Sequence, residues 1–232
     1  MNITNLTSPV IDFIFPKTSV ISGIKLHEEN SNQYLSDDEL KSIPLICNED
    51  KADLHEKVVS DHAFSLFAFR EGDDLSKLIY MLKYGGMKRL GEYLGKLLSA
   101  ELQKHIQSEK HICFDYLISV PLFKTKVRER GYNQSDCLCK GMNEILKIKF
   151  IPDLITRVRH TSTQTMLSKE ERMKNVEDAF ELKKKYITHI RGKRIILVDD
   201  VITTGSTLNE AVKILKMHEC AEVLVCTLAM AR

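Results

Sequence analysis

The stretch KRIILVDDVITTGST, residues 193–207, constrains the fold more than any other part of the chain. Four branched aliphatic residues bounded by charge predict a buried β-strand. A hydroxyl-rich turn follows, and STLNEAVKILKMH, residues 206–218, then places apolar residues on one face of a helix. The chain therefore contains a buried strand that runs through a short turn directly into a helix.

Other segments alternate between strand and helix in the same way. Strands are predicted over 114–123, ending at Pro121, and over 221–230; helices are predicted over 73–105, interrupted at Gly85 and Gly86, and over 133–148. Strands separated by helices of about ten residues or more need crossover connections, which favour parallel pairing. We therefore expect the α/β class, with a mostly parallel central sheet and helices on both faces.

Residues 1–60 differ from the rest of the chain because they are polar and irregular and show few periodic apolar positions. A chain of 232 residues can bury one core and carry an additional segment. We expect residues 1–60 to form a small irregular N-terminal appendage and residues 61–232 to form the α/β domain.

Charge and cysteine usage narrow the class of protein. The formal net charge is +2, so any attraction for nucleic acid or phosphate must come from local patches rather than from a general field. The six cysteines form no C-x-x-C pair, and the N-terminal MNITNLTSPVIDFIFPK shows no secretory leader, so we expect free thiols in the cytoplasm. No apolar run approaches the roughly 18 residues needed to cross a bilayer, and we expect no membrane partner.

Two adjacent carboxylates, Asp199 and Asp200, lie at the carboxyl end of the predicted strand, where ligands bind in open α/β sheets. The turn after them leads into a helix whose first N–H groups have no internal partners, and Gly205 lets the backbone approach an anion closely. The hydroxyl-bearing residues of this turn are Thr203, Thr204, Ser206 and Thr207. A phosphate-binding loop beside two carboxylates suits a ribose 5-phosphate, because that ligand combines a phosphate with hydroxyl groups and a carbon that can develop positive charge.

Two alternatives account for part of this pattern. An acidic strand end followed by a hydroxyl-rich turn also stabilises a helix N-terminus, although two adjacent buried carboxylates repel each other unless something pairs with them. A Walker B strand would need a G-x-x-x-x-G-K-[ST] loop, and the chain has none, because the spacing from Gly91 to Lys96 is wrong. A nucleoside triphosphatase is therefore disfavoured.

The segment ILVDDVITTGST resembles the 5-phosphoribosyl 1-diphosphate (PRPP) motif of the type I phosphoribosyltransferases. The segments SVPLFKTKVRERGYNQS and RVRHTSTQTMLSKEERMKNVEDAF precede it, and in this order, over residues 64–232, they are similar to the ComF family associated with bacterial competence. The resemblance implies a phosphoribosyltransferase-like fold. It also implies that Asp199 and Asp200 hold the ribose hydroxyls and favour positive charge at C1, that residues 203–207 hold the 5-phosphate, and that Mg²⁺ arrives with PRPP.

The resemblance places the start of a pyrophosphate loop at Val120, Pro121 and Leu122. Basic residues follow at once and suit a diphosphate, because arginine forks and lysine point charges bind its oxygens. They are Lys124, Lys126, Arg128 and Arg130, next to Gly131. A solvated basic helix face would account for the same residues.

The segment from Arg157 to Phe180 resembles the mobile lid of the family. Its candidate contacts are Arg157, Arg159, Thr161, Gln164, Arg172 and Asn175. A lid that excludes water would protect a reactive ribosyl cation from hydrolysis. An ordinary charged surface hairpin or helix would account for the same residues.

ComF proteins often begin with a four-cysteine zinc module, and FPKTSVISGIKL with QYLSDDEL resembles that module with its ligands replaced. By this comparison the replacing residues are Ser19, Ser22, Ser36 and Glu39. A serine hydroxyl is a poor zinc ligand at neutral pH, so we expect no structural zinc. Without the folding free energy of metal binding, the first 60 residues should be loose or be stabilised by packing IDFIF, residues 11–15, onto the core.

Two functions fit the sequence. In the first, PRPP and Mg²⁺ bind, pyrophosphate leaves, and an unknown acceptor receives the ribosyl 5-phosphate group at C1 with electrostatic help from the two carboxylates. In the second, a non-catalytic module keeps the PRPP pocket and acts on single-stranded DNA or a partner helicase in natural transformation, using the basic residues at 124–130 and 183–185. For base stacking in this second function, Tyr132 lies beside a basic stretch.

Overall fold

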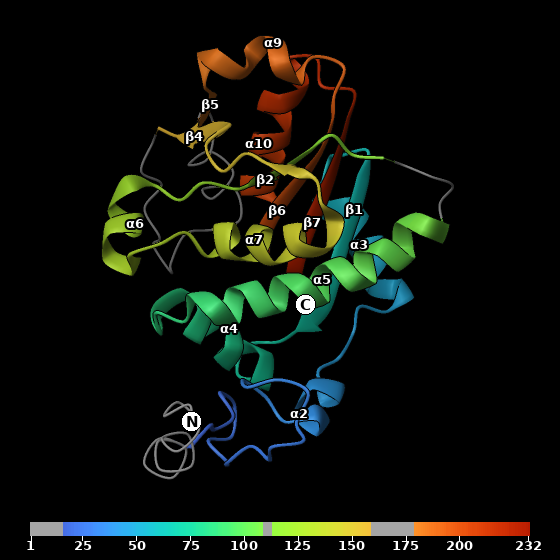
Figure 1. The fold of residues 1–232 in the computed structure, drawn as a ribbon. Helices are drawn as coiled ribbons and strands as arrows, with labels where there is room; N and C mark the ends of the chain where they lie inside the picture. Colours follow the sequence, from blue (N-terminus) through green and yellow to red (C-terminus); the bar gives the residue numbers. More distant parts are fainter. Residues whose placement is uncertain (1–15, 109–112, 159–178) are drawn as a thin grey trace, which may run out of the picture.

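The computed structural model describes residues 16–108, 113–158 and 179–232. Its central sheet has five strands in the order β1-β7-β6-β2-β3, and each neighbouring pair is parallel. The strands are β1 His62–Phe69, β2 Tyr116–Ser119, β3 Lys149–Phe150, β6 Arg194–Ile202 and β7 Glu222–Ala231. The α/β class and the parallel sheet predicted from the sequence are confirmed (Figure 1).

Strand β6 lies in the middle of this sheet, between β7 and β2. Its side chains alternate between the faces, so that Ile195 and Leu197 join the apolar cluster on one face, and Ile196 and Val198 join the cluster on the other. Because both faces of the strand are covered, it is apolar at every position from 195 to 198. Asp199 and Asp200 follow directly, near the carboxyl end of the strand, which continues to the buried Ile202.

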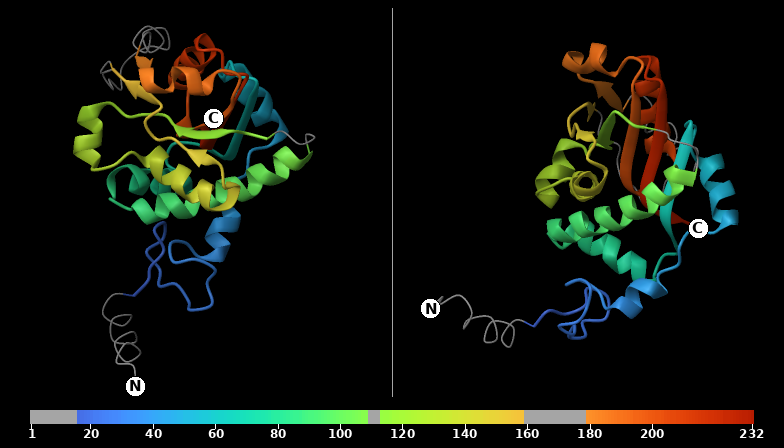
Figure 2. Two further views of the ribbon diagram at one scale, coloured as in Figure 1. Left: turned by 45° about the horizontal axis from the view of Figure 1, so that its top comes forward. Right: turned by 45° about the vertical axis from the view of Figure 1, so that its right-hand side comes forward.

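Helices cover both faces of the sheet (Figure 2). One face is covered by α4 Asp74–Tyr84, α5 Lys88–Ser108 and α7 Gln134–Leu146, and the other by α3 Asn48–Lys57 and α10 Ser206–Met217. The predicted interruption at Gly85 is confirmed, because Gly85 is the C-cap of α4. The predicted apolar faces of α4 and α10 are also confirmed as buried: Leu75, Leu78, Ile79, Leu82, Leu208, Ala211, Val212 and Leu215.

Several described elements lie outside the pattern predicted from the sequence, among them β1, α6, β4 and β5. Strand β1 forms one edge of the sheet and pairs with β7 over its length. The basic stretch after β2 forms a helix, α6 Lys124–Arg130, where the sequence predicts a loop. A second sheet pairs β4 Ile155–Arg157 with β5 Phe180–Leu182 in antiparallel fashion. Helix α6 and strands β4 and β5 have seven, three and three residues, which is too few to show a clear period. Strand β1 has eight residues, but its sequence HAFSLFAF does not alternate regularly between apolar and polar residues.

Two short helices, η2 Lys184–Tyr186 and α9 Ile187–Ile190, lie between β5 and β6. Lys183 and Lys185 both form ion pairs with Asp153, at 2.5 and 3.2 Å. The basic run at 183–185 is therefore partly neutralised within the fold. Among the described residues, no helix has the length and apolar character that a bilayer crossing requires.

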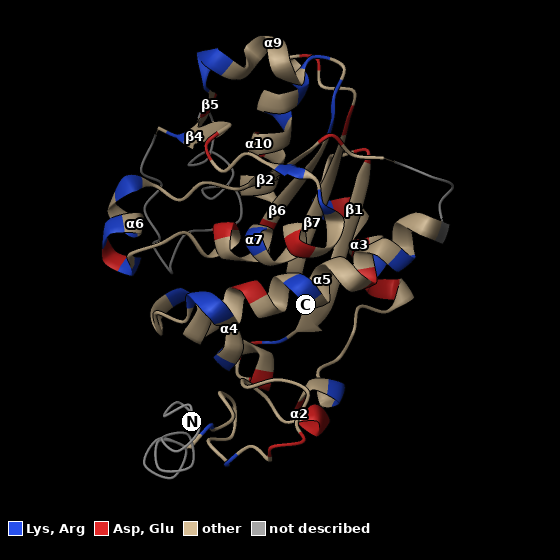
Figure 3. Cartoon of the chain, in the orientation of Figure 1, with Lys and Arg blue, Asp and Glu red and all other residues tan. Residues whose placement is uncertain are grey.

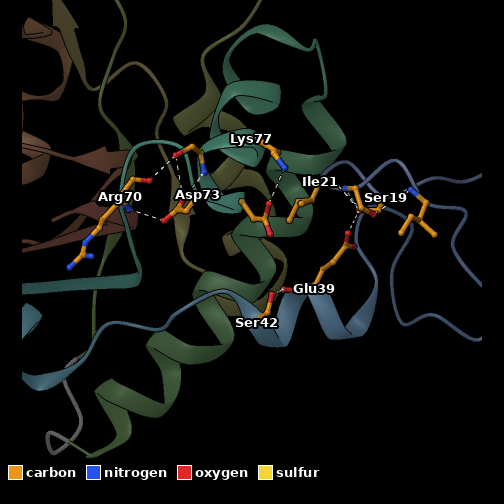
Figure 4. A network of polar contacts seen from close by, with 11 residues as sticks. Ser19, Ile21, Glu39, Ser42, Arg70, Asp73 and Lys77 are labelled. Carbon is orange, nitrogen blue, oxygen red and sulfur yellow. Dashed lines mark hydrogen bonds and ion pairs between the residues drawn. The ribbon is translucent and has the colours of Figure 1, made fainter.

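The described part of the N-terminal appendage, residues 16–60, contains the helices α2 Asp37–Ser42 and α3 Asn48–Lys57. Ser19 Oγ donates a hydrogen bond to Glu39 Oε1 at 2.8 Å (Figure 4). Ser36 N donates to Glu39 Oε2 at 2.7 Å, and Glu39 N donates to Ser36 Oγ at 3.1 Å. Burial would raise the pKa of Glu39, but hydrogen bonds from Ser22, Ser19 and Ser36 outweigh it and lower the pKa to about 2. The four residues in the thiolate positions thus form one hydrogen-bonded cluster; IDFIF lies outside the described residues.

Residues 43–58 form the last part of this appendage and attach it to the sheet. Ile46 N donates to Leu66 O and Ala68 N donates to Pro44 O, both at 3.1 Å, which ties the connection to β1. In α3, the Asp50 carboxylate accepts two hydrogen bonds from Arg232, at 2.8 and 2.7 Å. The Arg232 guanidinium holds the pKa of Asp50 well below its usual range although the carboxylate is buried.

Candidate functional site

The two adjacent carboxylates at the end of β6 have different partners. Asp199 Oδ1 accepts a hydrogen bond from Ser135 Oγ in α7 at 2.9 Å, and also one from the Asp200 backbone N–H at 2.9 Å. Asp200 Oδ1 accepts from Val201 N at 2.9 Å, and the Lys83 ammonium of α4 lies 3.0 Å from Asp200 Oδ2. Neutral donors and a cation therefore reduce the repulsion that two neighbouring carboxylates would otherwise suffer.

The surroundings of Asp199 favour its neutral form. Burial and the charge of Asp200 together raise the pKa of Asp199 to about 7, although the hydrogen bonds from Ser135 and the Asp200 backbone and the charge of Lys83 lower it. Two like charges in a water-poor site compete for ionisation, and their protons are lost as a pair. The charge of this site therefore changes close to neutral pH.

One oxygen of the pair is a buried acceptor. The Asp200 side chain is 6% exposed, and within the described part of the chain no hydrogen bond of acceptable geometry reaches Asp200 Oδ2, although Lys83 is 3.0 Å away. A buried acceptor of this kind costs free energy unless a donor approaches it. A hydroxyl group of a bound ligand would supply that donor.

The hydroxyl-rich turn and Asp199 line the same depression. Its wall consists of Asp199 and residues 201–208, which include all five predicted phosphate-binding residues, Thr203 to Thr207. Thr204 Oγ1 and Ser206 Oγ lie 2.9 Å apart, and the turn ends at the first residue of α10. The structure thus brings the predicted ribose and phosphate positions together.

Gly205 has a second reason to be glycine. Its φ is 77°, in the left-handed region, and a Cβ atom there would collide with the carbonyl oxygen of Lys57 at the end of α3. Asn209 fixes this contact, because its Nδ2 donates to Lys57 O at 2.9 Å and its Oδ1 accepts from Val59 N at 2.8 Å. The fold therefore requires glycine at this position whether or not an anion binds.

The predicted pyrophosphate loop begins beside β6. Val120 N donates to Val198 O at 2.8 Å, so residues 120–122 leave the sheet next to the strand that carries the two carboxylates. In α6, Lys124 and Arg128 are exposed, whereas Lys126 and Arg130 are half-buried. Half of the predicted basic set therefore points toward solvent.

Several cations gather near the two carboxylates. Burial lowers the pKa of Lys126, and the charges of Arg157, Arg130 and Lys83 lower it further. Burial also lowers the pKa of Arg157 at the end of β4, while the charge of Asp199 opposes that change. Of the predicted lid residues, Arg157 lies at this site, and Arg159, Thr161, Gln164, Arg172 and Asn175 lie outside the described residues.

Two residues of the site, Lys83 and Ser135, are absent from the set predicted from the sequence. Lys83 follows the buried Leu82 and lies two residues before Gly85, the C-cap of α4. Ser135 is fully buried in the first turn of α7. Ser135 is a polar residue among the buried positions of this helix, and a buried polar side chain needs a hydrogen-bond partner, which could have indicated its role. Tyr132, the predicted stacking residue, is instead buried, and its hydroxyl donates to Leu82 O.

Comparisons with known proteins identify related chains. Residues 144–232 match the family described as "Phosphoribosyl transferase domain". Competence protein F of Haemophilus influenzae is 35% identical over 159 residues, which cover 68% of this chain and 69% of that protein. DNA utilization protein YhgH of Escherichia coli strain K12 is 34% identical over 151 residues, and the matched part is 65% of the length of each chain.

Two solved structures are similar to part of this chain. The glutamine PRPP amidotransferase of B. subtilis superposes with a TM-score of 0.37 and 21% identity, over 58% of this chain and 25% of that chain. A hypoxanthine phosphoribosyltransferase of Staphylococcus aureus superposes with a TM-score of 0.39 and 14% identity, over 60% of this chain and 64% of that chain.

Proposed function

Because this chain belongs to the ComF (competence protein F) family, we propose that its site binds PRPP with Mg²⁺ and transfers the ribosyl 5-phosphate group to an acceptor. The observation that carries the proposal is the depression that Asp199 shares with residues 203–207. A carboxylate for a sugar and a helix N-terminus for a phosphate stand side by side there. Cations of α4, α6 and β4 interact with one another, and two of them, Lys83 and Arg157, also interact with the two carboxylates; such a group of cations suits a diphosphate.

Each group has a defined part in the proposed reaction. Asp199 and Asp200 accept hydrogen bonds from the ribose hydroxyls, and their negative charge stabilises the positive charge that develops at C1. The first N–H groups of α10 and the turn hydroxyls bind the 5-phosphate. Lys126 and Arg130 bind the diphosphate. The C1–oxygen bond to pyrophosphate breaks with its electron pair leaving on that oxygen, while the acceptor forms the new bond at C1.

In this proposal Mg²⁺ reaches the site bound to the substrate. The described residues contain no cluster of three or more histidine, cysteine, aspartate or glutamate side chains placed to hold a metal ion by themselves. Mg²⁺ keeps much of its water shell and binds readily to substrate phosphates, so the diphosphate would carry it, and it would neutralise charge on the leaving group. We place the reaction in the cytoplasm, which suits the free thiols of all six cysteines.

Calorimetric titration of Mg–PRPP tests this function. Wild type should bind saturably, and the Asp199→Asn, Asp200→Asn variant should not. Asp115→Asn is the matched control, because Asp115 accepts a hydrogen bond from Arg194 N at the opposite end of β6 and should not contact the ligand. Equal affinity of wild type and the double variant would remove both aspartates from the proposed site, and absence of binding to wild type would overturn PRPP binding.

A specific surface favours single-stranded DNA binding as a second function. Tyr80 and Tyr84 of α4 are 60% and 61% exposed, and their ring centroids lie 5.1 Å apart. The guanidinium of Arg130 stacks on the Tyr84 ring at 5.0 Å. Figure 3 shows lysine and arginine residues gathered on α6, whose last residue is Arg130. Exposed aromatic rings beside a basic helix can stack bases and attract a phosphate backbone.

This second function has its own test. The affinity of the full chain for a labelled oligothymidine is measured by fluorescence anisotropy. The Tyr80→Ala, Tyr84→Ala variant should bind about tenfold more weakly or worse, because each stacked base contributes about 1–3 kcal/mol. The Tyr80→Phe, Tyr84→Phe variant keeps the rings and should retain its affinity. Unchanged binding by the alanine variant would exclude this surface as the DNA site.

A further inference from the structure

Four consecutive residues at the start of α7, Asn133 to Asp136, connect separate parts of the proposed site. Asn133 Nδ2 donates a hydrogen bond to Val120 O at 3.0 Å. Val120 is the first residue of the predicted pyrophosphate loop. Gln134 Oε1 accepts a hydrogen bond from the Arg130 guanidinium of α6 at 2.9 Å. The turn therefore contacts both ends of the segment 120–130.

The next two residues of the same turn reach the sheet. Ser135 Oγ donates to Asp199 Oδ1 at 2.9 Å. Asp136 Oδ1 accepts hydrogen bonds from Ser119 Oγ at 2.5 Å and from Asn133 Nδ2 at 3.0 Å. Ser119 is the last residue of β2, directly before the pyrophosphate loop. One helical turn thus contacts Asp199, the carboxylate proposed to bind ribose, and Ser119, the residue before the pyrophosphate loop.

Helix capping is a separate role of Asn133 and does not account for these contacts. Asn133 is the N-cap of α7, and its Oδ1 accepts from Ser135 N at 3.2 Å, which satisfies one free N–H group of the helix. Capping does not require the buried Gln134 and the fully buried Ser135. Buried polar side chains are destabilising unless they are hydrogen-bonded, and here their partners belong to the proposed site.

We propose that Asn133 and Ser135 are positioning residues, and that the first turn of α7 holds the pyrophosphate loop and the ribose carboxylate in one arrangement. The consequence is coupling: a ligand that orders the loop at Val120 also orders Asp199, so one half of PRPP favours binding of the other half. This inference rests on the proposed function of the site. Ser135 acts through Asp199, and Asn133 acts through the main chain of Val120.

The first test needs no ligand. The carboxyl carbon of Asp199 is assigned by ¹³C NMR with the Asp199→Asn variant, and its pKa is measured in wild type and in Ser135→Ala. Loss of the hydroxyl donor should raise the pKa of Asp199, because a hydrogen bond to a carboxylate favours the charged form. The other titratable groups that face Asp199 are unchanged by the substitution: Asp200, Lys83, Arg157 and the Cys139 thiol of α7.

Ser99→Ala is the matched control for this test. Ser99 is also a fully buried helical serine, and its hydroxyl donates to Lys96 O at 3.0 Å within α5. A general loosening of packing would affect both variants alike. The inference requires that Ser135→Ala raises the pKa of Asp199 and that Ser99→Ala leaves it unchanged. An unchanged pKa in Ser135→Ala would overturn the role of Ser135.

The second test measures the coupling. The affinity for ribose 5-phosphate is determined with and without saturating Mg–pyrophosphate, in wild type and in Asn133→Ser, which keeps a capping oxygen and loses the amide donor to Val120. In wild type, Mg–pyrophosphate should strengthen ribose 5-phosphate binding severalfold, and the variant should lose that gain while binding each ligand alone. If wild type binds both ligands without coupling, the inference is overturned. If wild type binds neither PRPP, ribose 5-phosphate nor Mg–pyrophosphate, the proposed function is overturned, and the pKa comparison alone tests the role of Ser135.

Discussion

The Lys83 ammonium of α4 lies 3.0 Å from Asp200 Oδ2 at the end of β6. This ion pair joins a helix near the start of the α/β domain to the acidic motif near its end. The Asp200 side chain is 6% exposed and that of Lys83 is 24% exposed, so water screens the pair poorly. Lys83 therefore compensates a charge that the fold has buried in the proposed site.

Lys83→Met should destabilise the protein strongly. Removal of one partner leaves a buried charge uncompensated, which costs about 3 kcal/mol of unfolding free energy. Lys77→Met is the matched control in the same helix: Lys77 also lies 3.0 Å from a carboxylate, that of Asp74, but both side chains are more than half exposed. That variant should lose less than about 1 kcal/mol. Urea denaturation of both variants checks the difference, and equal losses would contradict a buried role for the Lys83 pair.

The Asp199→Asn variant should become more stable relative to wild type as the pH rises. The pKa of Asp199 is about 7 in the folded protein, above its ordinary value of 3.8. Between these two values the folded state holds the proton more tightly than the unfolded state, so rising pH destabilises wild type by at most about 1.4 kcal/mol per pH unit. The asparagine variant lacks this loss. The groups that set the pKa are Asp200, Ser135 and Lys83, and Arg157 interacts with the same carboxylate.

Denaturant titrations of wild type and Asp199→Asn at pH 5 and pH 8 measure this effect. The advantage of the variant over wild type should be larger at pH 8. A difference between the two proteins that does not change with pH would mean that Asp199 ionises at its ordinary pKa and lies in a more polar environment than the structure indicates.

Glu39→Gln should loosen the N-terminal appendage. The substitution removes the charge that accepts hydrogen bonds from Ser19 and Ser36, and hydrogen bonds to a charged group contribute about 1.5–3 kcal/mol. Amide hydrogen exchange over residues 16–46 should become faster. Asp38→Asn, an exposed acidic residue in the same first turn of α2, should change exchange little.

Acid should loosen the appendage of the wild-type protein in the same way as the Glu39→Gln substitution. The pKa of Glu39 is lowered from 4.5 to about 2, so its contribution to stability is present above pH 4.5 and is lost as the pH falls toward 2. Relative to the intrinsic exchange rate at each pH, hydrogen exchange in the appendage should become faster over this interval in wild type and not in the glutamine variant. Acceleration of equal size in both would assign the acid sensitivity to another group.

Gly205→Ala should destabilise the protein more than an alanine substitution at an ordinary glycine with left-handed φ. A Cβ atom at Gly205 meets the Lys57 carbonyl, and the left-handed φ adds strain of about 1 kcal/mol. Gly192→Ala is the control, because Gly192 has a φ of 66° and open space around its Cα. Thermal denaturation should show a loss of about 1 kcal/mol for Gly192→Ala and a loss at least about twofold larger for Gly205→Ala. Equal losses would mean that α3 moves aside without cost.

Hydrophobic patterning predicts the long elements of this fold well and the short ones poorly. The helices α4, α5 and α10 and the strands β6 and β7 are long enough to show a period, and the breaks at Gly85 and Pro121 are readable from single residues. Helix α6 has seven residues, four of them basic, and no buried residue. Such a segment shows no apolar face, so its pattern does not distinguish a helix from a loop.

The sequence by itself determined the contiguous part of the candidate site. Asp199, Asp200 and residues 203–207 are neighbours in the chain, so a strand that ends there must place them at one edge of the sheet. Only the tertiary structure decided what surrounds them. Ser135 lies 64 positions from Asp199, and Lys83 and Arg157 reach the site from other elements. Local sequence patterns record the period of one element, whereas the meeting of distant side chains depends on strand order and helix packing, which the whole chain sets together.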